Sequence, residues 1–115
     1  MHELSIAMSI VDAASAEAAR RGASHVNAVH LKLGPLSGVV KDALLFSYEV
    51  ACEGTALEGS RLLIEDIPVI AYCALCRRQQ QIDSIQRFAC PKCGALTPDV
   101  TQGRELLLTA LEIEQ

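Results

Sequence analysis

Apolar residues near the start of the chain recur at spacings of three and four, which is the period of one face of an α-helix. This stripe covers residues 4–21 and is followed by Gly22, a residue type that commonly ends helices. We therefore predict a first helix there. Its predicted inward positions are Leu4, Ala7, Met8, Val11, Ala14 and Ala18.

A second helical pattern covers residues 39–51, with predicted inward positions at Val40, Ala43, Leu44, Ser47 and Ala51. Three other segments, residues 29–33, 61–67 and 105–114, alternate between apolar and polar positions, which is the period of a strand. His25 is expected in the turn before the first strand. His30 is expected on the polar face of that strand, and both histidines are interpreted as solvated.

Helices and strands therefore lie on both sides of a cysteine-rich insert, and we expect the last strand to return to the first sheet. The predicted fold class is α+β, with a two-helix, three-stranded sheet domain interrupted by a zinc-ribbon lobe. The predicted boundaries are residues 1–68 plus 99–115 for the α/β domain and residues 69–98 for the ribbon.

Four of the five cysteines form two Cys-x-x-Cys pairs, Cys73 with Cys76 and Cys90 with Cys93, separated by thirteen residues. The spacing is typical of zinc sites in which two tight turns each aim two sulfurs at one ion. Four thiolates fill the tetrahedral shell and leave no place for water, so the predicted zinc is structural. A thioredoxin-like redox pair needs one such motif only, and an iron–sulfur cluster is the other alternative. Cys52 stands apart and is interpreted as a small buried hydrophobe.

The net charge of −4 argues against broad attraction to nucleic acid. Four basic residues do lie in the cysteine-rich segment, and they are interpreted as a solvated face or a partner contact: Arg77, Arg78, Arg87 and Lys92. No apolar run approaches the roughly 20 residues that span a bilayer. Glu3 stands where a signal peptide would carry basic residues, so we expect a cytoplasmic protein.

His2 is the candidate ligand for a second metal. Beside a free α-amine, such a histidine offers the amine, backbone amides and an imidazole to one ion, and planar nitrogen donors suit Ni(II) or Cu(II) better than Zn(II). The alternative is an exposed, frayed terminal residue. Glu3 lies in the first helical turn, where a carboxylate stabilises the positive end of the helix dipole; contact with metal is the other interpretation.

Several motifs, in order and with their spacing, resemble the HypA/HybF family of nickel-insertion accessory proteins for [NiFe]-hydrogenase. Besides the first cysteine pair, they are Met1-His2-Glu3-Leu4-Ser5, Gly34-Pro35-Leu36-Ser37-Gly38-Val39, Cys90-Pro91-Lys92-Cys93-Gly94 and Gly103-Arg104-Glu105-Leu106. The loop between the cysteine pairs carries no histidine, which puts in doubt any nickel or pH response that relies on one there.

The resemblance implies a nickel-binding domain with a zinc-ribbon lobe set into it. It implies that His2 is a nickel ligand, with the Met1 amine and the amides of His2 and Glu3 as co-ligands. It also places Cys73, Cys76, Cys90 and Cys93 at the zinc positions of the family.

The function implied by the resemblance is that of a metallochaperone, not an enzyme. Members deliver nickel to the hydrogenase large subunit together with a GTPase maturation factor, and some serve urease maturation. The residues themselves offer no paired carboxylates, nucleophile–base set or phosphate-binding glycine loop. The alternative function is a zinc-ribbon adaptor that binds proteins and never handles nickel.

Overall fold

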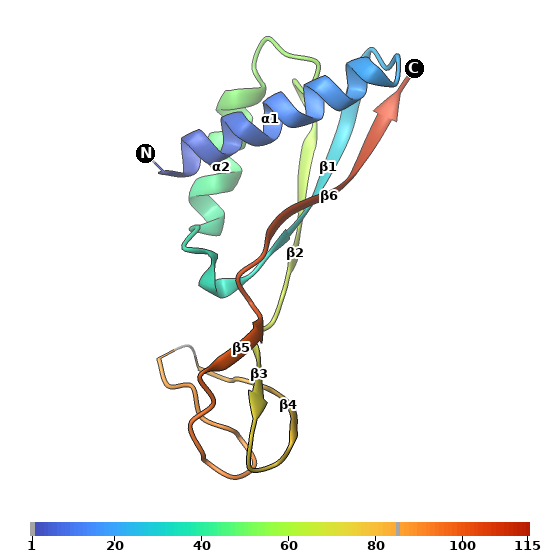
Figure 1. The fold of residues 1–115 in the computed structure, drawn as a ribbon. Helices are drawn as coiled ribbons and strands as arrows, with labels where there is room; N and C mark the ends of the chain where they lie inside the picture. Colours follow the sequence, from blue (N-terminus) through green and yellow to red (C-terminus); the bar gives the residue numbers. More distant parts are fainter. Residues whose placement is uncertain (1, 85) are drawn as a thin grey trace. The chain divides into compact units, whose positions relative to one another are not determined.

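The computed structural model describes residues 2–84 and 86–115, and Figure 1 shows their course. The elements, in chain order, are α1 (His2–Arg20), β1 (His25–Leu33), a short 3-10 turn (Pro35–Ser37), α2 (Lys41–Cys52), β2 (Arg61–Asp66), β3 (Ile70–Cys73), β4 (Arg78–Gln81), β5 (Asp99–Gln102) and β6 (Leu106–Glu114). Within the described residues there are thus two α-helices and two three-stranded sheets, which confirms the predicted α+β class.

The contacts divide the chain into two compact units, which are described separately. Unit 1 consists of Met1–Leu31, Val39–Ile64 and Leu108–Gln115. Unit 2 consists of Lys32–Gly38 and Glu65–Leu107. Unit 1 contains both α-helices, and unit 2 contains the four cysteines of the two Cys-x-x-Cys motifs.

The core of unit 1 forms where α1 and α2 pack on each other and on the sheet. It is built from small and branched side chains, with Tyr48 as its one buried aromatic among the described residues. The buried stripe of α1 consists of Ala7, Ile10, Val11, Ala14 and Ala18. Among the described residues, neither helix combines the length and the apolar character that a membrane crossing requires.

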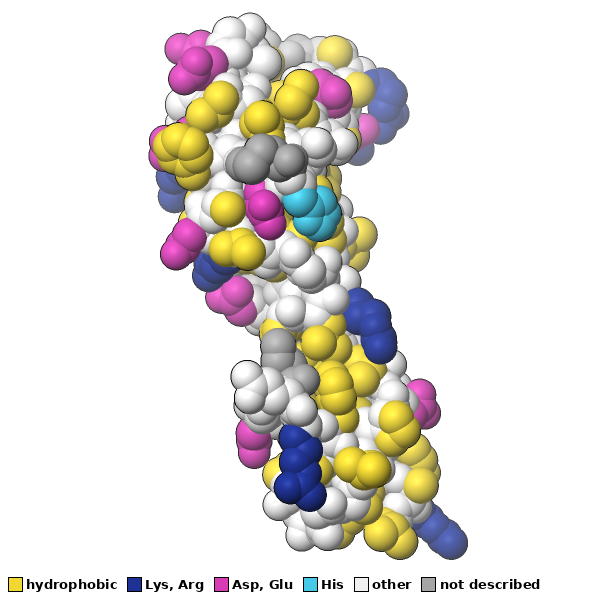
Figure 2. All heavy atoms as spheres, turned by 90° about the vertical axis from the view of Figure 1, so that its left-hand side faces the viewer, with side chains coloured by type: hydrophobic (Ala, Val, Ile, Leu, Met, Phe, Trp, Pro, Cys, Tyr) yellow, Lys and Arg dark blue, Asp and Glu magenta, His cyan; other side chains and the backbone are white. Residues whose placement is uncertain are grey.

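Two predicted inward positions are wrong. Met8 is 53% exposed, because it lies about 100° around α1 from Ala7, at the margin of the buried stripe, whereas Ile10 lies within that stripe. Val40 is 60% exposed because it precedes the first turn of α2 as its N-cap residue. Figure 2 shows that hydrophobic side chains reach the surface on this side of the molecule.

The first sheet has the strand order β2-β1-β6, so the last strand does return beside the first, as predicted. His25 is not in a turn: it is the first residue of β1. His30 lies half-buried on the same strand, and its Nε2 is 2.7 Å from a carboxylate oxygen of Glu112 in β6. A side-chain pair thus joins residues far apart in the sequence.

The second sheet belongs to unit 2 and has the order β4-β3-β5. β3 pairs antiparallel with β4, from Ile70 opposite Gln81 to Cys73 opposite Arg78. A small apolar cluster consists of the buried Val69, Ala71 and Ile82, with Leu36, Phe88 and Val100 packed against them. Ile85, the other large apolar residue in the sequence between the two cysteine pairs besides Ile82 and Phe88, lies outside the described residues.

Two backbone segments of unit 2 approach each other closely at Gly34 and Gly103. The Gly34 amide donates to the Glu105 carbonyl at 2.9 Å, and the Leu36 amide donates to the Gly103 carbonyl at 2.8 Å. A Cβ on Gly34 would lie only 2.1 Å from that same Gly103 oxygen. The absence of a side chain at Gly34 is therefore what permits this approach.

Candidate metal centres

The first cysteine pair lies at the tight turn between β3 and β4. Cys73 is the last residue of β3, and its carbonyl accepts a hydrogen bond from the Arg77 amide at 2.7 Å. Arg77 has a positive φ of 56°, an uncommon conformation for a residue other than glycine. The turn points the Cys76 amide at the Cys73 sulfur, at 3.4 Å. The backbone thus both folds the pair together and donates a hydrogen bond to one sulfur.

The second pair has the same construction. The Gly94 amide donates to the Cys90 carbonyl at 2.8 Å, and the Lys92 amide points at the Cys90 sulfur at 3.4 Å. Gly94 has a φ of +78°, which a residue without a Cβ adopts at little cost. The Cys90 amide donates in turn to the Ala95 carbonyl at 2.8 Å, which closes the turn.

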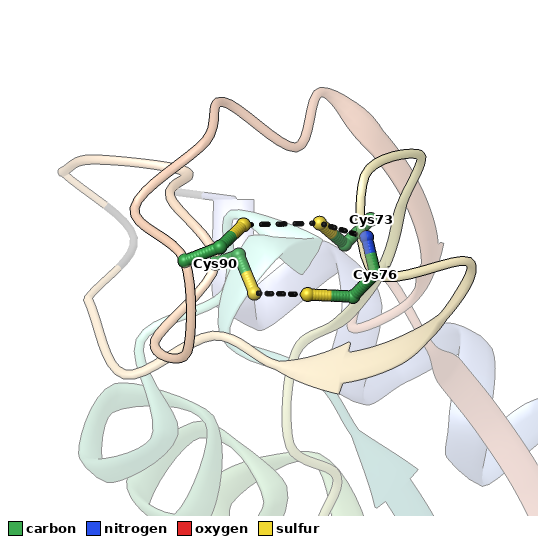
Figure 3. Close-up of side chains that lie close together, drawn as sticks. Cys73, Cys76 and Cys90 are labelled. Atoms are coloured by element: carbon green, nitrogen blue, oxygen red, sulfur yellow. Dashed lines mark hydrogen bonds between the residues drawn. The ribbon is translucent and has the colours of Figure 1, made fainter.

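The two turns bring four sulfur atoms together. All four lie within 4.8 Å of one another; Cys73 Sγ is 3.5 Å from Cys93 Sγ, and Cys76 Sγ is 3.8 Å from Cys90 Sγ. Figure 3 shows the labelled cysteines pointing inward toward one another. Four sulfurs held at about 2.3 Å from a central zinc lie about 3.8 Å apart in a regular tetrahedron. The spacing therefore fits one zinc ion.

The electrostatics of the cluster favour a cation. Burial alone would raise the pKa of the Cys90 thiol, but hydrogen bonds from the Cys93 and Lys92 amides outweigh it and lower that pKa to about 7. The neighbouring Cys93 sulfur, together with burial and the other two sulfurs, raises the pKa of Cys76 to about 12. Thiolates this close repel one another, so the four can ionise together only when a positive ion lies among them.

The cysteines are free thiols, and the sulfur distances are far longer than a disulfide bond of about 2.05 Å. Within the described residues, the four form the single group of three or more side chains that could hold a metal ion. The fifth cysteine, Cys52, is buried in the core of unit 1, as expected, near Ser60 and Tyr48. Burial raises the pKa of its thiol.

The N-terminal candidates lie at the start of α1. His2 is the first residue of the helix and is exposed, while Met1 lies outside the described residues. The Glu3 carboxylate accepts a hydrogen bond from the Val40 amide at 3.1 Å. That bond, followed by one from its own amide, lowers the pKa of Glu3.

The Glu3 bond joins the first turn of α1 to the residue before α2. The sequence does not predict this bond, because no local pattern relates two residues thirty-seven positions apart. It gives Glu3 a structural partner beyond the helix dipole, and contact of Glu3 with nickel stays a prediction.

Comparison with known proteins decides the family. A profile described as hydrogenase/urease nickel incorporation, metallochaperone, HypA, matches residues 1–113. The chain belongs to the HypA family. The HypA family is one of metallochaperones and not of enzymes, which agrees with the sequence prediction.

Relatives of this HypA-family chain match over nearly their whole length. A hydrogenase maturation factor HypA from Roseiflexus sp. is 50% identical over 114 residues, covering 99% of this chain and 93% of the relative. The HypA of Chloroflexus aurantiacus is 47% identical, covering 97% and 98% of the two chains. These identities extend through both units described above.

Solved structures agree in fold. The solution structure of the nickel metallochaperone HypA from Helicobacter pylori has a TM-score of 0.66 at 24% identity and covers 97% of each chain. Another solution structure of a HypA protein has a TM-score of 0.71 at 25% identity, covering 98% of this chain and 96% of its own. The HypA fold therefore extends across both units.

Proposed function

We propose that this HypA-family chain carries Ni(II) at its N-terminus and delivers it during [NiFe]-hydrogenase maturation. His2 provides the imidazole, and the Met1 amine and the amides of His2 and Glu3 are the other nitrogen donors. The match of the nickel-incorporation family to residues 1–113 is the observation that carries this proposal. The exposed position of His2 at the start of α1 supports it, because ligand exchange with an acceptor requires access to the ion.

The four-cysteine cluster has a different proposed role. Cys73, Cys76, Cys90 and Cys93 hold one structural Zn(II), whose closed shell leaves no position for substrate or water. Soft sulfur donors retain zinc, while the nitrogen donors of the terminus suit nickel, so the two metals are sorted by ligand chemistry. The proposed domains are a nickel-binding domain of residues 1–68 plus 99–115 and a zinc ribbon of residues 69–98.

The partners proposed for this carrier follow from its family. The relatives are named hydrogenase maturation factors, which supports a role beside the hydrogenase large subunit and a GTPase maturation factor. The family description also includes urease, so urease maturation proteins are further candidate partners. The proposed location is the cytoplasm, as expected from the sequence.

A nickel titration of the zinc-loaded, untagged protein tests the proposal. The wild type should bind about one nickel per chain with the visible absorption of a planar nitrogen site, and His2→Ala should lose it. His25→Ala is the matched control, since it removes a histidine that begins β1 and should leave binding unchanged. Equal binding by wild type and His2→Ala, or none by either, would refute His2 as the ligand.

The second candidate function is a zinc-ribbon adaptor that never handles nickel. Two large apolar side chains of unit 2 favour it: Leu75 is 75% exposed and Leu96 is 74% exposed. Exposed apolar side chains mark a protein contact site where they gather in one contiguous patch. A wild-type protein that binds no nickel, yet still binds a maturation partner through Leu75 and Leu96, would make the adaptor the better account.

A further inference from the structure

The outer side of α2 carries an apolar ridge that no part of the described chain covers. Phe46 is 70% exposed and Val50 is 45% exposed. They are four residues apart, so they lie one above the other on the same side of the helix. A large aromatic ring held in water on a regular helix is an unusual surface feature, and aromatic side chains are the commonest energetic anchors of protein contacts.

Acidic side chains flank this ridge. Asp42, Glu49 and Glu53 are all exposed; helical geometry places Asp42 and Glu49 within about 60° of Phe46 around the helix axis, and Glu53 is the C-cap residue that directly follows α2. Within the described part of the chain, no ion pair neutralises any of the three. We call these three acids, with Phe46 and Val50, the outer face of α2. Figure 2 shows acidic side chains, together with basic ones, interspersed with hydrophobic side chains on this side of unit 1.

The outer face of α2 begins beside the N-terminal candidates. Glu3, next to His2, accepts the hydrogen bond from the Val40 amide at 3.1 Å, and Val40 directly precedes α2. Phe46 follows Val40 by six residues, which is about 9 Å along a helix. A protein segment that covers Phe46 can therefore also reach His2.

We propose that the outer face of α2 is the docking surface for the protein that accepts nickel from His2. The occupant is a segment of the hydrogenase large-subunit precursor in which apolar side chains are flanked by lysine or arginine. The apolar side chains cover Phe46 and Val50, and the basic ones meet Asp42, Glu49 and Glu53. This proposal rests on the proposed function, because it assumes that nickel leaves from the N-terminus.

Docking of the acceptor on α2 would favour transfer of nickel from His2. An acceptor held on α2 keeps its own ligands close to His2, so that ligand exchange becomes effectively intramolecular. The three acids speed encounter with a basic segment at low salt, and the contact of Phe46 prolongs the complex. Neither the ridge nor the acids are needed to bind nickel itself.

The experiment measures two quantities on each variant: the Kd for the purified, nickel-free large-subunit precursor, and the nickel stoichiometry. Phe46→Gln keeps a good helix former and removes the ring; Glu49→Lys reverses one charge. The matched control is Leu96→Gln, which removes an equally exposed apolar side chain from unit 2, 74% against 70% exposed. Thermal melts check that each variant is folded.

We expect Phe46→Gln to raise the Kd about 30-fold, as for an aromatic anchor, and Glu49→Lys to raise the Kd and weaken its salt dependence. Leu96→Gln should bind the precursor like wild type, and all three variants should bind nickel like wild type.

The docking proposal is overturned if the wild type does not bind the precursor, or if Phe46→Gln and Glu49→Lys bind it unchanged. It is also overturned if only Leu96→Gln weakens binding, which would move the contact to the zinc lobe. Failure of the proposed function is distinct, because it would appear as loss of nickel binding in the wild-type titration, whatever the Kd for the precursor.

Discussion

Replacing Gly34 by alanine should destabilise the protein strongly, although alanine is a small residue. The backbone of Gly34 has φ −96° and ψ 152°, an ordinary extended conformation, so the effect is not one of backbone strain. The new Cβ would lie 2.1 Å from the Gly103 oxygen, 2.3 Å from the Gly103 carbonyl carbon and 3.0 Å from the Arg104 nitrogen. All three are backbone atoms, which cannot rotate out of the way.

The expected cost has two parts. Forcing a methyl group into a packed contact costs about 1–3 kcal/mol. Separating the two backbone segments enough to admit it also breaks the bonds from Gly34 to Glu105 and from Leu36 to Gly103, at about 0.5–1.5 kcal/mol each. The sum is about 2–6 kcal/mol, a large share of the stability of a domain of this size.

Thermal unfolding followed by circular dichroism, at one fixed zinc concentration, measures this cost. The midpoint of Gly34→Ala should fall by about 8 °C or more. Gly38→Ala is the matched control: Gly38 has a φ of +81° but nothing within 4 Å of an added Cβ, so it should lose about 1 kcal/mol only. If Gly34→Ala were as stable as Gly38→Ala, the steric reasoning would be refuted.

Three further predictions concern single sites. Zinc should leave the cysteine cluster as the pH falls, because protons compete for the thiolates. A zinc-sensitive dye should detect release from Cys93→Ser at a higher pH than from the wild type. Identical release curves for the two proteins would argue against a metal ion at the cluster. The hydrogen bond from the Val40 amide lowers the pKa of Glu3, so the ionised carboxylate stabilises the fold above the ordinary pKa of a glutamate, and this stability is lost as the pH falls through the lowered pKa. An NMR titration of the Glu3 carboxyl group should find the lowered pKa. An ordinary or raised pKa would contradict the hydrogen bond. Tyr48→Phe removes the hydroxyl that lies 2.7 Å from Ser60 Oγ and should cost about 1 kcal/mol in urea unfolding. Burial raises the pKa of Tyr48, so an ultraviolet titration of the folded protein should show this phenol ionising at a higher pH than free tyrosine does. Ionisation at the pH of free tyrosine would mean that the Tyr48 side chain is accessible to solvent.

Much of the fold was predictable from local pattern. The period of three and four in the first helix and the alternation in the last strand locate α1 and β6 to within a few residues. The cysteine spacing predicted the cluster because two tight turns leave few ways to arrange four sulfurs. Even the return of β6 to the first sheet followed from the placement of the insert.

What the pattern missed depends on contacts between distant segments. Periodicity places a side chain on a helix only to within about one position, which is why Met8 was assigned inward and Ile10 was not. Val40 has an apolar side chain, which suggests an inward position, but it is the N-cap residue of α2 and is exposed. The hydrogen bond from the Val40 amide to Glu3 joins α1 to the N-cap residue of α2, and no local sequence pattern predicts it.

Two of the motifs that carried the family resemblance have a structural explanation. The segment beginning at Gly34 lies against the segment beginning at Gly103 and donates two backbone hydrogen bonds to it. Their residues therefore serve the folding of unit 2 rather than metal chemistry. Resemblance in those segments identifies the fold, whereas the proposed metal chemistry depends on His2 and the four clustered cysteines.

The placement of β6 also sets an order of events during synthesis. The stretch from Ile67 to Glu105, roughly forty residues, is translated after β2 and before β6. At a translation rate of about 5–20 residues per second, β6, the second strand that pairs with β1, is synthesised about 2–8 s after β2. All four cysteines are translated in that interval, so the sulfur ligands of the proposed zinc site are made before the strand that completes the first sheet.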